Sequence, residues 1–323
     1  MKRRQILLLI CKAAVSALLI WLVLRRIDLA GIELRLDALN FWWLLPSLVM
    51  VPASILMSAW RWHKLSLGLI GFRSAVCYTW IGVFFGTILP GFVGGDIAKG
   101  VSLATKNSRM RDARLPLSII TDKLVGFWVL LLLFGFASVS LLFVSPGILM
   151  VARNALVVGV FLALGGLGLG ITACSPRGIL VLASLVRRLP TVVLRDYSMR
   201  VIAAAGSLQG QEKLLWSTSA ISLALHSMNV LAFWFCMRAL SIPASLMFAA
   251  VFYPMLTFVL AIPVSISGVG VRDAFSAAIF TAFGLNPAAG VAFSWLLLLF
   301  GILSGLIGGC IQLFEMFRRS ATG

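Results

Sequence analysis

Residues 88–96 read ILPGFVGGD, and residues 262–273 read IPVSISGVGVRD. Each stretch interrupts an apolar segment with proline and glycine and ends in a charged residue, and one lies in each half of the chain. In membrane proteins, matched breaks at corresponding positions of two halves are typical of a transport site near the bilayer midplane. The two stretches therefore predict a carrier built from two related halves.

The rest of the chain is apolar enough to lie in a membrane. Of its 323 residues, 61% are hydrophobic and 11% are charged, whereas soluble domains average about 45–50% apolar and about 25% charged residues. Apolar runs long enough to cross a hydrocarbon core about 30 Å thick occupy residues 6–24, 41–59, 117–144, 151–173, 215–237 and 287–314. The pattern predicts an all-α polytopic membrane protein with six full transmembrane helices and no separate catalytic domain.

Two shorter apolar segments fit re-entrant helical hairpins. The first covers 75–100, with its break at Pro90, and the second covers 248–285. Three full spans separate them, and an odd number of crossings reverses direction. The two halves, 1–144 and 151–323, are therefore expected to be inverted-topology repeats within a single integral membrane domain. The alternative is that the prolines only kink continuous helices and the glycines allow close packing.

The formal net charge of +17 follows this topology. Nineteen of the 27 lysine and arginine residues fall on one side if both termini are cytoplasmic, as the positive-inside rule requires. We therefore expect cytoplasmic termini, in a bacterial inner membrane, and basic loops that face anionic lipid instead of nucleic acid. Segment 174–214 predicts an amphipathic cytoplasmic connector, which either sets topology or recruits lipid or a partner enzyme.

The sequence indicates no cofactor, no metal site and no catalytic residue. The five cysteines are scattered singly, His63 and His226 are solitary, and no glycine-rich run has the lysine of a phosphate-binding loop. We interpret the cysteines and histidines as packing residues. The glycines of 165–170 and 301–309 predict close helix packing, within one chain or between copies in a homo-oligomer.

Groups near the two breaks form the predicted substrate-binding site. A charge at mid-bilayer costs about 2.5–3.5 kcal/mol even on the lenient insertion scale, so each one needs a partner or a cavity. Cations and exposed backbone N–H groups suit the phosphate of a lipid headgroup, and carboxylates would hold those cations or face a cationic headgroup. The residues that we expect in this site are Pro90, Gly94, Gly95, Asp96, Lys99, Asp122, Lys123, Ser267, Gly268, Gly270, Arg272 and Asp273.

Two further charged motifs need an interpretation. Asp122 and Lys123 cannot satisfy each other, because adjacent residues on a helix do not face one another, so Asp122 needs another partner. The alternative for this pair is that Lys123 extends to the membrane interface. The motif Trp60-Arg61-Trp62-His63-Lys64 is interpreted as an interface anchor, with indoles at headgroup depth and cations toward cytoplasmic lipid.

These motifs resemble the lysylphosphatidylglycerol synthase transmembrane region family over essentially the whole chain. The residues that carry the resemblance are Trp60-Arg61-Trp62, Pro90-Gly91, Gly94-Gly95-Asp96-Ile97, Ser118, Asp122-Lys123-Leu124, Gly126 and Ser267-Gly268-Val269-Gly270-Val271-Arg272-Asp273. Lys99 and Lys123 stand where the family leads us to expect arginine, and Asp273 where we expect glutamate. These differences keep each charge but replace a planar bidentate donor by a point charge and shorten one carboxylate arm.

The resemblance implies a flippase-like lipid translocase without the soluble synthase domain of its aminoacyl-phosphatidylglycerol relatives. The implied partner is an anionic or aminoacylated phospholipid or a polyprenyl-linked lipid, with a lipid-synthesis enzyme as a further candidate at the cytoplasmic face. Two other classes stay open. One is a membrane-embedded glycosyl or acyl transferase, for which Asp96, Asp122 and Asp273 are the only plausible carboxylate set. The other is a non-transporting accessory subunit of a lipid-synthesis complex.

Overall fold

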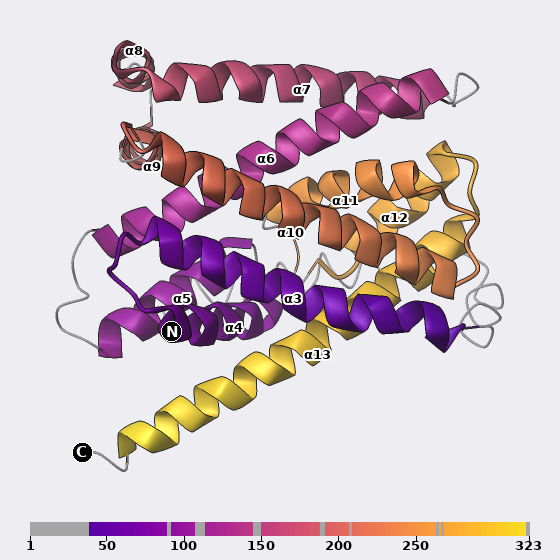
Figure 1. The fold of residues 1–323 in the computed structure, drawn as a ribbon. Coiled ribbons are helices and arrows are strands. Elements are labelled where there is room, and N and C mark those ends of the chain that lie inside the picture. The colour runs from indigo at the N-terminus through magenta and orange to yellow at the C-terminus, as the bar shows by residue number, and fades with distance from the viewer. Residues whose placement is uncertain are drawn as a thin grey trace.

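The computed structural model describes residues 39–320, except for 89–91, 107–113, 145–149, 188–190, 207–208, 263–264 and 266–267. Throughout these ranges the regular elements are helices, with no strand, so the all-α class is confirmed (Figure 1). The helices are α3 (Phe41–Leu65), α4 (Phe72–Ile88), α5 (Phe92–Lys106), α6 (Arg114–Val144), α7 (Met150–Cys174), α8 (Pro176–Arg187), α9 (Val192–Gly206), α10 (Glu212–Ala239), α11 (Leu246–Ala261), α12 (Val271–Ala282) and α13 (Pro287–Ser320).

Four helices in the described part are long and apolar enough to cross a membrane, namely α3, α6, α10 and α13. They contain four of the runs that the sequence predicts as spans. A fifth run, 151–173, coincides with the 25-residue helix α7. The sixth run, 6–24, lies outside the described residues. The chain is an integral membrane protein, and the count of six spans stays a prediction.

Both Pro/Gly stretches lie between two helices. The first lies between α4 and α5, at residues 89–91, and the second separates α11 from α12 at residues 262–270. Gly268 and Gly270 have φ angles of +75° and +81° at the second break, a conformation that residues with a Cβ rarely adopt. The glycines of the second stretch therefore mark a break between α11 and α12. Residues 89–91 lie outside the described residues, so a break at Pro90 stays a prediction.

The two interrupted pairs of helices start at opposite ends of the bundle. In Figure 1, α4 starts and α5 ends at the end where the C-terminal end of α13 lies, whereas α11 starts and α12 ends at the other end. We call the first pair hairpin one (α4 and α5) and the second pair hairpin two (α11 and α12). This arrangement is the one that inverted repeats require, and its re-entrant position in a bilayer stays a prediction.

Each hairpin packs on α13 in its own way. The α4 helix meets α13 through small residues: Gly308 lies on the Trp80 carbonyl group, and Gly309 lies on the Phe84 ring. Hairpin two packs through an aromatic cluster instead, in which the Phe252 ring contacts the rings of Phe280 and Phe293. Close packing within one chain is thus found at Gly166, Gly305, Gly308 and Gly309, whereas an added Cβ at Gly165, Gly168 or Gly301 would meet nothing within 4 Å.

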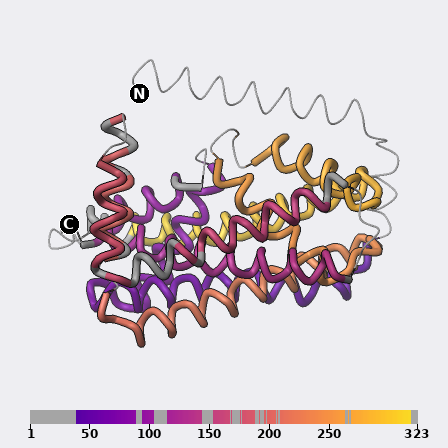
Figure 2. The backbone as a smooth tube through the Cα atoms, turned by 90° about the horizontal axis from the view of Figure 1, so that it is seen from above, coloured from indigo at the N-terminus to yellow at the C-terminus, as the bar shows by residue number. Residues whose placement is uncertain are grey.

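The segment between α7 and α10 forms two short helices at one end of the bundle. Helix α8 lies across the direction of the long helices, end-on in Figure 1 and upright in Figure 2. Its apolar residues Leu180, Val181 and Leu185 are exposed, and Arg177 and Arg187 lie at its two ends. This is the pattern of an amphipathic helix on a membrane surface.

Candidate functional site

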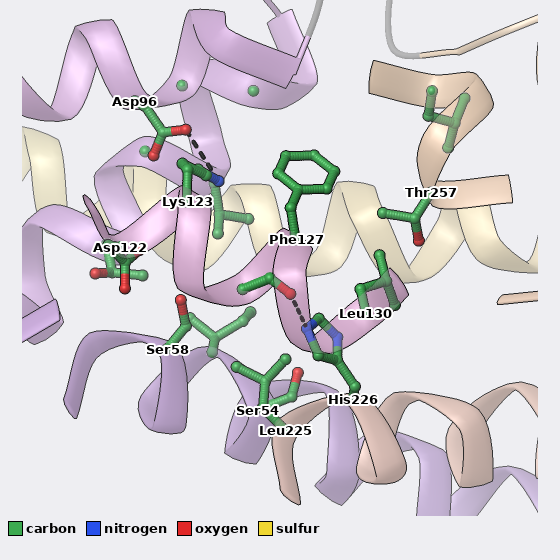
Figure 3. Close-up of a pocket in the computed structure, with 18 of the residues that line it drawn as sticks. Ser54, Ser58, Asp96, Asp122, Lys123, Phe127, Leu130, Leu225, His226 and Thr257 are labelled. Atoms are coloured by element: carbon green, nitrogen blue, oxygen red, sulfur yellow. Dashed lines mark hydrogen bonds and ion pairs between the residues drawn. The ribbon is translucent and has the colours of Figure 1, made fainter. Parts of the chain in front are cut away.

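A cavity of about 470 Å³ lies where the two breaks converge. Hairpin one contributes Gly86, Gly95, Asp96 and Lys99, and hairpin two contributes Leu260, Ile262, Ser265, Gly268 and Val271. Helices α3, α6 and α10 supply the remaining walls, some of whose side chains are shown in Figure 3. The cavity therefore joins residues from both halves of the chain.

Two buried charges of the cavity form an ion pair between α3 and α6. Arg61 Nε donates to Asp122 Oδ1 at 2.7 Å, and its Nη1 donates to Ser222 Oγ at 2.9 Å. Both charged side chains are almost fully buried. Asp122 thus finds the partner that its sequence neighbour Lys123 could not provide, which confirms that prediction.

Arg61 lies inside the protein, and this corrects one interpretation of the sequence. Arg61 and Trp62 are buried, so they do not anchor the chain at a membrane interface. Trp60 is 45% exposed, and Lys64 lies over its ring at 5.3 Å, as an anchor requires. The difference arises because neighbouring residues on α3 point to different sides, and the sequence does not show which side faces inward.

A second group of charges links hairpin one to α6. Lys123 Nζ contacts Asp96 Oδ2 at 2.9 Å, as Figure 3 shows, and the Lys123 side chain is 33% exposed. Lys99 Nζ lies 3.9 Å from Asp96 Oδ1 and only 3.6 Å from the centre of the Trp62 ring. Lys99 is thus held by a cation–π contact and by a distant carboxylate.

Neutral polar groups line the wall opposite these charges. His226 Nε2 lies 3.0 Å from the Gly126 carbonyl oxygen (Figure 3), and His226 Nδ1 lies 2.9 Å from the Tyr253 hydroxyl. Since a carbonyl only accepts, Nε2 carries a proton and donates to the Gly126 oxygen, whereas in the contact of Nδ1 with the Tyr253 hydroxyl either group can donate. Both ring nitrogens of His226 are therefore hydrogen-bonded, in line with its interpretation as a packing residue, although it also borders the cavity.

Arg272 and Asp273 form a separate buried cluster at the start of α12. Asp273 accepts from the backbone N–H of Gly270 at 3.0 Å and from the Ser294 hydroxyl, which in turn accepts from Arg272 Nε at 2.7 Å. The Asp273 carboxylate thus caps α12 and ties it to α13. Neither charged side chain lines the cavity.

The structure therefore divides the predicted site residues into groups. Those that line the cavity are Gly95, Asp96, Lys99, Asp122, Lys123 and Gly268. Those that lie beside it are Gly94, Gly270, Arg272 and Asp273. Pro90 and Ser267 lie outside the described residues.

Some cavity residues did not emerge from the sequence as site residues. These are Arg61, Thr79, Tyr253 and His226. Arg61 gave a signal, since an arginine beside an apolar run needs either a buried partner or a position at the membrane interface. The sequence alone does not decide between these two. Thr79 and Tyr253 gave none, because a hydroxyl within an apolar helix is unremarkable until the packing is known.

Both carboxylates of the described cavity wall are paired with cations. Asp122 is held by Arg61, and Asp96 is held by Lys123. Within the described ranges, no group of three or more His, Cys, Asp or Glu residues is placed to hold a metal ion.

The sequence of the chain matches one known protein family. Residues 9–309 match the family model described as "Lysylphosphatidylglycerol synthase TM region". The chain matches no curated protein and no solved structure. The resemblance that the motifs indicated is thereby confirmed over nearly the whole length.

Proposed function

Because the chain belongs to the lysylphosphatidylglycerol synthase transmembrane region family, we propose that it moves a phospholipid between the two leaflets of a membrane. The family makes the chain a membrane protein tied to lipid metabolism or transport. Translocation is more specific than this link to lipids, and the cavity between the two hairpins is the observation that supports it.

The argument begins with the cost of charge in a membrane. Arg61, Lys99 and Asp122 are nearly fully buried, and they belong to helices of a chain that lies in hydrocarbon. Burying a charge in a membrane costs several kcal/mol, so charged residues are rare there. Those that are present typically mark substrate pathways. A volume of about 470 Å³ is within the range of ligand-binding cavities, about 300–1,000 Å³. It suits a lipid headgroup, whose acyl chains would remain in the bilayer.

The two ion pairs suggest which part moves. Arg61 and Asp122 join α3 to α6 deep in the protein, whereas the more exposed Lys123 joins α6 to Asp96 in hairpin one. We infer that the first pair holds the scaffold and that the second pair opens when a headgroup enters. Rocking of one half against the other would then expose the cavity to each leaflet in turn.

The described structure gives the alternative classes less support. A transferase needs a carboxylate ready to act as a base, but Asp122 is paired with Arg61 and Asp273 caps α12. An accessory subunit needs no charged cavity. We further propose that α8 lies on the cytoplasmic surface of an inner membrane, because its arginines flank an exposed apolar face.

Lipid movement in proteoliposomes tests the proposal. Fluorescent phosphatidylglycerol, aminoacyl-phosphatidylglycerol and polyprenyl phosphate are each monitored by the accessibility of their headgroups to a membrane-impermeant quencher, against protein-free vesicles. We expect the protein to accelerate the movement of at least one phospholipid, and Asp96→Asn and Lys123→Gln to slow it at least about tenfold.

Matched controls keep the result specific to the cavity. Asp196 and Lys213 are exposed and do not line the cavity, so Asp196→Asn and Lys213→Gln should transport at the wild-type rate. No movement of any of the lipids, or full transport by both cavity variants, would overturn the proposal.

A further inference from the structure

The described cavity wall carries one more positive charge than negative charges. Its cations are Arg61, Lys99 and Lys123, and its carboxylates are Asp96 and Asp122. Each carboxylate is in close contact with one cation, Asp122 with Arg61 and Asp96 with Lys123. Lys99 is the remaining cation.

Among the described residues, no ion pair that Lys99 makes with a carboxylate is short enough for a hydrogen bond. The side chain is about 4% exposed, and its carboxylate contact in the described structure is Asp96 at 3.9 Å, which is too long for a hydrogen bond. One face of the ammonium group is covered by Trp62. The Asp122 carboxylate also attracts the ammonium group. An ammonium group has three N–H donors, and a buried one whose donors lack acceptors at hydrogen-bonding distance is costly unless a ligand supplies them.

Thr79 provides a second polar group with no partner in the described residues. Its side-chain oxygen is buried without a hydrogen bond, the residue is 9% exposed, and it lines the same cavity. Thr79 lies one turn before Gly82 on α4. A Cβ at Gly82 would lie 3.4 Å from Lys99 Cβ, so the Lys99 side chain packs against this face of α4. The hydroxyl and the ammonium group therefore border one part of the cavity.

We propose that Lys99 and Thr79 form an anion subsite for the phosphate of a lipid headgroup that has one net negative charge and no amino group. The inference rests on the proposed function for the lipid as the source of that phosphate. A phosphodiester neutralises the one excess cation, and it accepts from both the ammonium group and the hydroxyl. An aminoacylated headgroup would bring a further ammonium group to a cavity whose carboxylates are already paired.

Lipid binding tests the subsite separately from transport. The full chain in detergent is titrated with phosphatidylglycerol, with lysylphosphatidylglycerol and with glycerol 3-phosphate, and binding is followed by the shift in melting temperature. We expect phosphatidylglycerol to bind at least about tenfold more tightly than lysylphosphatidylglycerol. We expect Lys99→Gln and Thr79→Val each to weaken phosphatidylglycerol binding about tenfold or more, as the loss of a hydrogen bond to a charged group predicts.

Two features make the variants informative. Thr79→Val keeps the shape of the side chain and removes a hydroxyl without a partner in the described structure, so the unliganded melting temperature should not fall. Thr218→Val is the matched control, because Thr218 is buried in α10, donates to the Leu214 carbonyl and does not line the cavity. If Lys99→Gln does not fold, Thr79→Val decides the question.

The outcomes separate this inference from the proposed function. Tighter binding of lysylphosphatidylglycerol, or unchanged phosphatidylglycerol binding in Thr79→Val, overturns the subsite even if transport is observed. Subsite-dependent binding of phosphatidylglycerol without transport supports the subsite and contradicts translocation. Equal binding of glycerol 3-phosphate and phosphatidylglycerol would overturn the lipid as the source and identify a free phosphate ester as the ligand.

Discussion

Arg61 on α3 and Asp122 on α6 form a buried ion pair with a separation of 2.7 Å between Nε and Oδ1. The pair holds two helices together where the cavity begins, and Ser222 extends it to α10. Burying two charges is costly, so such a pair is weak evidence for stability in itself, but removing one partner leaves the other uncompensated. The pair is therefore best understood as a fixed junction of three helices.

Neutralising one member of this junction should destabilise the protein strongly. We expect Asp122→Asn to lower the free energy of unfolding by about 3–5 kcal/mol, because Arg61 would remain buried without its carboxylate. Unfolding of the purified protein with a denaturing detergent measures the change. The double variant Arg61→Met with Asp122→Leu should recover much of the loss, and additive losses in a double-mutant cycle would contradict the assignment.

The Asp96–Lys123 pair should behave differently, because Lys123 is partly exposed. Because Lys123 is partly exposed and Lys99 remains 3.9 Å from Asp96, we expect Lys123→Gln to lower the unfolding free energy by clearly less than Asp122→Asn does, while it slows lipid movement. The two quantities are measured on the same preparation. A stability loss as large as that of Asp122→Asn would show that this pair belongs to the scaffold and not to the moving part.

The positions of the helices could be predicted because apolar length determines them. The run 215–237 lies within α10 (Glu212–Ala239), and the run 117–144 coincides with α6 to within a few residues. The second break was equally predictable, since Gly268 and Gly270 adopt positive φ angles. These features depend on residues that are close together in the chain, so they can be recognised in the sequence.

The partners within the cavity could not be predicted, because they depend on how the helices pack. Arg61 and Asp122 are 61 residues apart, and α3 is apolar on several sides, so it lacks the amphipathic pattern that shows which face is buried. For the same reason Arg272 seemed as suitable for a ligand as Lys99. Only the packing of α12 on α13 shows that Arg272 Nε donates a hydrogen bond to Ser294, whose hydroxyl in turn donates to Asp273.

The glycine contact between α13 and α4 should tolerate no side chain. An added methyl at Gly308 would overlap the Trp80 carbonyl group, so Gly308→Ala should force the helices apart and destabilise the protein by about 1–3 kcal/mol. Gly301 lies on the same helix with nothing within 4 Å of a Cβ. Gly301→Ala is thus the control and should be neutral or stabilising by up to about 1 kcal/mol. Equal melting temperatures for the two variants would rule out close packing at Gly308.

The cap of α12 should contribute to folding and not to lipid contact. Ser294 links Arg272 to Asp273, and all of these side chains are buried outside the cavity wall. Ser294→Ala leaves both charges without this hydroxyl, and we expect a loss of about 1–3 kcal/mol in unfolding free energy. The rate of lipid movement per folded molecule should stay near the wild-type value, as measured in proteoliposomes with the folded fraction determined by gel filtration. A rate that falls while stability is kept would place Arg272 and Asp273 in the headgroup site together with Asp96 and Lys99.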